Sequence, residues 1–278
     1  MTLAQMLYDP YLSQVIGRAL CVGILVALCA ALLGVSLVLR RFSMIGDGLS
    51  HVGFGAMAVA TVLGMTDYTL EIAIPIVVAA AFVILRLGEN NCLHGDSAVA
   101  LLSTGAIAVG SLIFNFSGTR NTDVCNSLFG SASIITLTNK DLILSIVLSL
   151  CVLTLFLLFY RQIFAITFDE PFARACGLPA GAYQSMIAVL TAVTIVLGMK
   201  MMGAVMISGL VVFPALSAMR FCRTFRAVTI WAALIAVFCL IVGFFIACVL
   251  SFQTGPTVVC VNLAVYVLCA LIGKKAVK

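Results

Sequence analysis

The sequence has few charged residues: Asp, Glu, Lys and Arg make up 9% of its 278 residues, whereas a soluble domain has about 25%. Hydrophobic residues make up 64% of the chain, and the mean hydropathy is +1.26. This composition excludes an intrinsically disordered chain, a coiled coil and a secreted disulfide scaffold. It predicts a protein that crosses a membrane several times.

Signatures of catalysis are missing. The one Gly-Lys pair, Gly273–Lys274, has Leu268 where a phosphate-binding loop has its first glycine. No His-Glu-x-x-His or Gly-x-Ser-x-Gly motif occurs, and two histidines leave few candidates for acid–base chemistry. We therefore expect no enzyme activity, and any energy from a nucleotide would come from another chain.

The 11 cysteines form no Cys-x-x-Cys motif and lie mostly inside apolar runs. We interpret them as small buried hydrophobes rather than as disulfides or thiolate metal ligands. The first 14 residues contain no Lys or Arg, so a signal peptide is not expected and the first apolar run should stay in the membrane.

Nine apolar runs are long enough for membrane helices, because one span needs about 20 apolar residues. Their continuous apolarity favours helices over the alternating strands of a barrel. We expect an all-α, polytopic membrane protein with eight or nine transmembrane helices in a single domain, residues 1–278. The runs cover residues 15–39, 49–65, 70–85, 98–116, 142–159, 183–199, 204–219, 228–252 and 257–272.

The positive charges predict the orientation. An outside N-terminus and a cytoplasmic C-terminus place 11 of the 15 Lys and Arg residues on the cytoplasmic side, as the positive-inside rule requires. These residues are Arg40, Arg41, Arg86, Arg161, Arg174, Arg220, Arg223, Arg226, Lys274, Lys275 and Lys278.

Three connections between the runs stand out. The polar outer stretch 117–140 is long enough for a re-entrant piece. The stretch 161–182 is the largest cytoplasmic loop. Between the sixth and seventh runs only residues 198–203 turn the chain, which predicts a tight helical hairpin.

The segment Ile45-Gly-Asp-Gly-Leu-Ser-His51 is the first candidate site. Asp47 and His51 are four positions apart, so on a helix they project from one face and could share a divalent cation. The alternative is that Asp47 caps the helix and His51 makes a hydrogen bond between helices.

The segment 167–177 is the second candidate. Asp169 can cap a short helix, Pro171 fits its first turn, and Gly177 suits the position just past its end. Such a helix would present Phe172, Ala173 and Cys176. It could lie on the membrane or dock into a partner, and the residues alone favour neither.

The third candidate is the seventh run, which begins at Gly203 and contains Ser208, Gly209 and Pro214. Short hydrophobic segments interrupted by Gly and Pro point to a transport pathway. A simple packing kink is the alternative.

Four motifs, in the same order, resemble the membrane permease subunits of bacterial ABC importers for zinc, manganese or iron. The resemblance extends over almost the whole chain. The motifs are the segment from Leu39-Arg-Arg to Gly-Asp-Gly-Leu-Ser-His51, Ser127-Leu-Phe-Gly130, the segment from Lys200-Met-Met-Gly to Phe-Pro-Ala215, and Gly255-Pro-Thr-Val-Val259.

This resemblance implies a homodimer with an ABC ATPase on the cytoplasmic side and an external metal-binding protein that delivers the ion. It implies that Asp47 and His51 are ligands in the ion path, and that zinc is the foremost substrate, with manganese or iron as alternatives. It gives the role of coupling helix to the segment with Asp169, Glu170, Phe172, Ala173 and Gly177. After His51 the sequence reads Val-Gly-Phe-Gly, where zinc importers of the family have Ala-Ser-Leu.

The expected location is the cell (inner) membrane, and the metal ion is expected as a transported substrate, with no permanently bound cofactor. Two other functions stay open. One is a self-sufficient secondary carrier driven by protons or sodium, which the scarcity of intramembrane carboxylates disfavours. The other is a membrane scaffold or anchor that transports nothing.

Overall fold

The computed structural model describes residues 10–40, 42–65, 68–89, 95–116, 130, 139–250 and 252–276. Within these residues the chain forms helices and no strand, as expected. The helices are α2 (Pro10–Leu39), α3 (Ile45–Val62), α4 (Thr69–Glu89), α5 (Gly95–Phe116), α7 (Asn139–Leu158), α8 (Tyr160–Phe168), α9 (Glu170–Ala175), α10 (Ala180–Met202), α11 (Ala204–Met219), α12 (Phe225–Leu250) and α13 (Thr254–Ala276).

Each of the nine apolar runs falls on one of the helices in the described part of the chain. Seven of these helices are long and apolar enough to cross a membrane, judged by length and composition. The other two are α11, which has only 16 residues, and α3, whose hydropathy is lowered by Asp47 and His51. The additional helices α8 and α9 lie in the stretch 161–182, apart from the first residue of α8.

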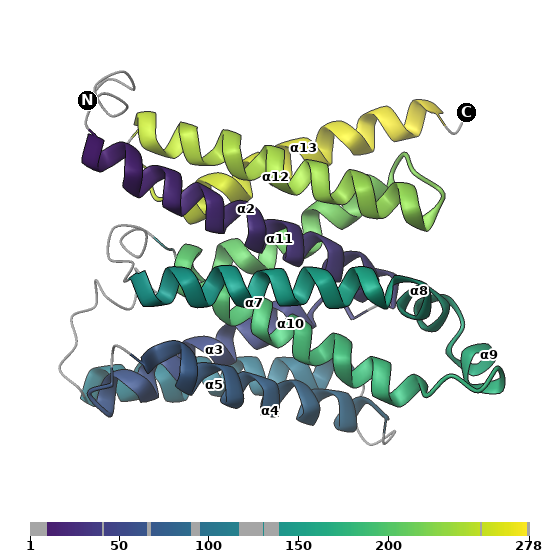
Figure 1. Cartoon of the computed structure of the whole chain (residues 1–278), viewed down its shortest axis with the longest axis horizontal. Coiled ribbons are helices and arrows are strands. Elements are labelled where there is room, and N and C mark those ends of the chain that lie inside the picture. Colours follow the sequence, from purple (N-terminus) through teal and green to yellow (C-terminus); the bar gives the residue numbers. More distant parts are fainter. Residues whose placement is uncertain are drawn as a thin grey trace.

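The long helices run roughly side by side (Figure 1). Helices α12 and α13 lie along one side of the bundle, α3, α4 and α5 lie along the opposite side, and α2, α7, α10 and α11 lie between them (Figure 1). Helix α2 begins and helix α13 finishes at opposite ends of the bundle, and α8 and α9 lie at the end where α13 finishes (Figure 1).

The centre of the bundle is formed by α2, α10 and α11. In α2 and α10, 72% of the apolar span is buried inside the chain, against 17% in α13 and 22% in α5 and α7. The outer helices therefore expose large apolar side chains, as helices that face lipid do.

The contact between α2 and α11 depends on Gly34. A Cβ atom at this position would lie 2.0 Å from the backbone carbonyl oxygen of Val211. Small residues allow membrane helices to approach this closely. The missing side chain at Gly34 therefore allows α11 to pack directly against α2.

The hairpin between the sixth and seventh runs is tighter than predicted. Helix α10 continues through Gly198 to Met202, and Gly203 alone separates it from α11. Gly203 has φ 90° and ψ 156°, a conformation open essentially to glycine alone, which allows one residue to reverse the chain. The predicted re-entrant piece in 117–140 lies outside the described residues except for Gly130, Asn139 and Lys140.

Candidate metal path and docking helix

Asp47 and His51 face each other on the first half of α3. The His51 Nε2 atom lies 3.6 Å from Asp47 Oδ1, and the exposed fractions of the two side chains are 19% and 53%. This separation is too long for a hydrogen bond, and a cation could contact both side chains after small movements. The prediction that the two side chains share one helical face is confirmed.

The alternative roles of these residues are wrong. Asp47 does not cap α3, because the N-cap residue is Met44 and no side chain caps this helix. His51 makes no hydrogen bond between helices, since its Nδ1 atom is buried and has no partner in the described residues. Both side chains therefore retain unused capacity to bind a ligand.

The Ser208 side chain of α11 lies near Asp47 of the neighbouring helix. The two helices touch here, because a Cβ atom at Gly46 would lie 3.3 Å from Val211 Cγ1. The Ser208 hydroxyl also donates a 3.0 Å hydrogen bond to the Val205 carbonyl oxygen. Of the four residues predicted on the seventh run, the structure brings this one to Asp47.

Gly203 lies in the turn, and Gly209 and Pro214 are buried in packing. A Cβ atom at Gly209 would lie 3.0 Å from Val259 Cγ2 of α13. Helix α11 runs through both residues without a break. Pro214 removes only its own N–H bond to the preceding turn, and α2, α12 and α13 pack around the helix and support it.

The donor set at Asp47 is small. Among the described residues no group of three or more His, Cys, Asp and Glu side chains could hold a metal ion. Structural zinc sites have four protein ligands. Two ligands suit brief contact with a passing ion better than permanent binding.

The short helix α9 has the predicted ends. The Asp169 carboxylate accepts a 2.9 Å hydrogen bond from the Phe172 N–H. Gly177 has φ 83°, and its N–H donates to the Arg174 carbonyl oxygen, while the Leu178 N–H donates to that of Ala173. This is a Schellman motif, and it stops the helix after two turns.

The outward face of α9 carries Phe172, whose exposed fraction is 65%, and Cys176 is also exposed. Ala173 is 1% exposed and packs with Ile166 and Ala180. The prediction that the helix presents Ala173 is therefore wrong. Neighbouring residues on a helix point about 100° apart, so Phe172 and Ala173 cannot share a face.

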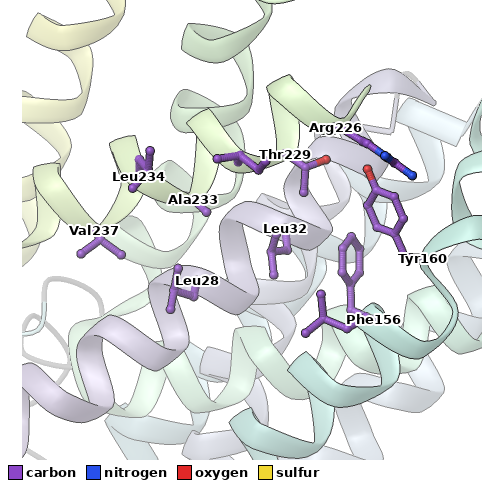
Figure 2. Close-up of a pocket in the computed structure, with 11 residues that line it drawn as sticks. Leu28, Leu32, Phe156, Tyr160, Arg226, Thr229, Ala233, Leu234 and Val237 are labelled. Atoms are coloured by element: carbon purple, nitrogen blue, oxygen red, sulfur yellow. The ribbon is translucent and has the colours of Figure 1, made fainter. Parts of the chain in front are cut away.

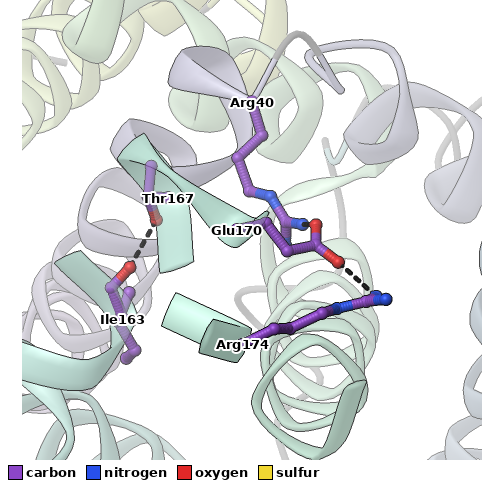
Figure 3. Close-up of polar contacts among 5 residues, drawn as sticks. All are labelled: Arg40, Ile163, Thr167, Glu170 and Arg174. Carbon is purple, nitrogen blue, oxygen red and sulfur yellow. Dashed lines mark hydrogen bonds and ion pairs between the residues drawn. The ribbon is translucent and has the colours of Figure 1, made fainter. Parts of the chain in front are cut away.

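Glu170 joins α9 to the bundle. Its Oε2 atom accepts a 2.7 Å hydrogen bond from Arg40, and its Oε1 atom accepts a 2.5 Å bond from Arg174 (Figure 3). Arg40 directly follows α2, seven positions before Asp47. The Arg40 and Glu170 side chains are 10% and 27% exposed. Reasoning from sequence missed this pair; the available signal was that Glu170 is one of few acidic residues at an end of the bundle that is rich in Lys and Arg.

The second and third motifs meet at the other end of the bundle, and Thr254, the residue just before the fourth motif, joins them there. A Cβ atom at Gly130 would lie 2.0 Å from the Met202 carbonyl oxygen and 3.0 Å from the Gly203 nitrogen. The Thr254 hydroxyl donates a 3.0 Å hydrogen bond to the Gly130 carbonyl oxygen. Close by in the chain, Lys200 pairs with Asp141 at 2.9 Å and joins α10 to α7.

Comparisons with known proteins agree with the resemblance. A model of the ABC 3 transport family matches residues 13–273. The zinc uptake system membrane protein ZnuB of Haemophilus influenzae is 30% identical over 92% of this chain and 96% of its own length. The manganese transport system membrane protein MntC of Halalkalibacterium halodurans is 24% identical over 98% of this chain and 90% of its own length.

The fold also matches a solved structure. A chain of PsaBC from Streptococcus pneumoniae, in complex with Fab, superposes with a TM-score of 0.82 at 23% identity, over 96% of this chain and 93% of that chain. With its apolar helices, the protein is thus a multi-pass membrane protein. The family match over nearly the whole chain shows that it belongs to the ABC 3 transport family.

Proposed function

We propose that this protein is the permease subunit of an ATP-driven importer for a divalent transition metal ion. The observation that carries the proposal is the facing pair Asp47 and His51, which lies on an apolar helix in a member of a transport family. Ionisable groups inside membrane helices usually mark an ion or substrate path.

Zinc is the foremost substrate, with manganese or iron as alternatives. Imidazole suits zinc and iron, and a carboxylate extends the range to manganese. The ZnuB relative has the higher identity, and the MntC relative leaves manganese open. The ion passes between Asp47 and His51, with the Ser208 hydroxyl as a weak third ligand, and such sparse coordination allows its release.

Helix α9 is the coupling helix. Phe172 extends away from the bundle and docks into the ATPase. Asp169 and Gly177 stabilise the two ends of the helix. The buried Ala173 holds the helix against the rest of the chain. Movement of α9 then reaches α3 through Glu170 and Arg40. The one-residue turn at Gly203 serves as a pivot between α10 and α11, and the buried Gly209 and Pro214 set how α11 moves.

In the complete transporter, two copies of the chain form the membrane path and each binds a cytoplasmic ABC ATPase that hydrolyses ATP. An external binding protein delivers the metal to the side where the chain begins. All residues from 1 to 278 form one domain in the cell membrane, with the C-terminal end and α9 facing the cytoplasm. The metal is substrate, and no permanent cofactor is needed.

Uptake of radioactive zinc and manganese into proteoliposomes tests the proposal. The chain is reconstituted with its ATPase and binding protein, as wild type and as Asp47→Asn and His51→Gln variants. Each substitution removes one of only two strong ligands, and we expect uptake to fall at least about tenfold. Thr61→Val, a matched change on α3 that removes a hydroxyl bonded to Met57, should leave uptake unchanged.

Three results would reject the proposal. Normal uptake in both variants would remove Asp47 and His51 from the ion path. Uptake by the chain alone, driven by a proton or sodium gradient, would show a secondary carrier. A chain that assembles with no ATPase and moves no metal would instead be a scaffold.

A further inference from the structure

A groove of ≈ 590 Å³ lies between α2, α7 and α12, on the outside of the bundle. Leu28 and Leu32 form its wall on α2, Phe156 lies on α7, and Ala233 and Val237 lie on α12 (Figure 2). We refer to it as the α2–α12 groove. No residue of this groove takes part in the proposed metal path or in the docking of α9.

The α2–α12 groove opens toward the surroundings of the bundle. Leu157, Ile230 and Leu234 line it and are 64%, 60% and 55% exposed. Exposed apolar side chains of this size on a membrane helix face hydrocarbon. The groove is therefore accessible from lipid.

Polar groups gather at one end of the groove. Arg226 and the Tyr160 hydroxyl group lie next to each other there (Figure 2). The Tyr160 hydroxyl oxygen is buried, with no hydrogen-bond partner in the described part of the chain. Arg226 is exposed and takes part in none of the ion pairs that the described residues form. This end can accept a negatively charged group.

The length of the groove matches one leaflet of a bilayer. From Arg226 to Val237, α12 advances 11 residues, or about 16 Å at 1.5 Å per residue. The hydrocarbon core of a membrane is about 30 Å thick. The charged end lies near the first residue of α12, at the end of the bundle where α8 lies (Figure 1).

We propose that the α2–α12 groove binds a phospholipid with an anionic headgroup. One acyl chain lies along the apolar wall, and the headgroup phosphate contacts Arg226. Basic pockets between membrane helices bind anionic headgroups in this way. A water-soluble ligand would find polar partners only at one end, and its remaining surface would face leucine and phenylalanine.

The bound lipid would also brace α8. The Tyr160 ring packs at a tilt against Phe225 with ring centroids 5.3 Å apart, and Phe164 of α8 contacts the same ring at 5.1 Å. A filled groove holds the Tyr160 ring against this cluster. Helix α8 leads directly into α9, so lipid binding would stabilise the position of the proposed coupling helix.

Native mass spectrometry of the full chain in mild detergent tests the proposal, with phosphatidylglycerol and phosphatidylcholine as probes. Loss of one arginine near an anionic headgroup should weaken binding about fivefold, so Arg226→Gln should lower phosphatidylglycerol binding by that factor. It should lower phosphatidylcholine binding less, because the choline cation offsets the negative charge of the phosphate. Arg223→Gln is the matched control, since Arg223 is exposed at the same end and does not line the groove.

A second variant tests the apolar part. Ala233→Phe fills the middle of the groove and should lower the binding of both lipids. Equal phosphatidylglycerol binding by the Arg226 and Arg223 variants would overturn the headgroup assignment. Unchanged lipid binding in Ala233→Phe would overturn the groove assignment, and a loss of chain dimers in that variant instead would show that a second copy occupies the groove.

Discussion

The Arg40 guanidinium donates a 2.7 Å hydrogen bond to Glu170, across 130 positions of sequence. Arg40 lies between α2 and α3, and Glu170 begins α9. Helix α9, which we propose binds the ATPase, is thus hydrogen-bonded to the connection between α2 and α3. Helix α3 carries Asp47 and His51. The first prediction follows from this contact.

Arg40→Gln and Glu170→Gln should each lower the amount of metal transported per ATP hydrolysed, because each removes one charge from a mostly buried pair. The double variant should be no worse than either single variant, since residues that act through one contact are not additive. Measuring uptake and ATP hydrolysis in the same proteoliposomes gives this ratio. Arg174→Gln is the control, because the Arg174 side chain is 59% exposed and exposed ion pairs contribute little. Additive losses would show that the pair transmits no movement.

Phe172→Asp should uncouple ATP hydrolysis from transport. Phe172 is 65% exposed, so the change should leave folding intact while it places a charge in the proposed docking contact. Binding of the purified ATPase to the chain, together with uptake, measures the effect. Phe252→Asp makes the same change at a residue that is 62% exposed in the connection between α12 and α13, and it should preserve binding. Equal behaviour of the two variants would place the docking contact elsewhere.

Gly203→Ala should destabilise the chain. Gly203 has φ 90° and ψ 156°, and a side chain in this region costs about 1–3 kcal/mol of unfolding free energy. The measurement is the thermal unfolding midpoint in detergent, followed by labelling of the buried thiols of Cys29 and Cys239. Gly105→Ala in α5, where a Cβ atom would meet nothing within 4 Å, should not lower the midpoint. A Gly203→Ala variant as stable as this control would show that the turn adapts without strain.

Labelling of Cys176 should report the orientation of the chain. Cys176 is exposed just after α9, so a membrane-impermeant maleimide should modify it in inside-out vesicles and spare it in intact cells. A cysteine introduced as Met65→Cys, at an exposed position between α3 and α4, should show the opposite pattern. Peptide mass spectrometry quantifies both sites. The reverse result would place the start of the chain in the cytoplasm.

The membrane helices could be predicted from sequence because a span is recognised by length and apolarity alone. The ends of α9 were also predictable, since Asp169 and Gly177 act within a few residues of their own position. Helix α8 was missed because it follows α7 after a single turn residue, Phe159, with no Gly, Pro or capping side chain to mark the boundary.

The candidate site was predictable only in its local part. The spacing of Asp47 and His51 requires their common face on a helix. The approach of Ser208 to Asp47 and the pair of Arg40 with Glu170 depend on how distant helices pack. The periodicity of a single helix contains no information about these contacts. For the same reason the burial of Ala173 could not be predicted from its own helix, because it depends on packing against Ile166 and Ala180.

Helix α2 begins and helix α13 finishes at opposite ends of the bundle (Figure 1). Two copies joined in tandem would therefore need a connecting segment that returns across the bilayer, about 20 further apolar residues. A short flexible linker could not fuse the two copies of the proposed dimer into one working polypeptide. Gene duplication followed by simple fusion would thus fail for this architecture, and an engineered tandem would have to include an extra membrane-crossing helix.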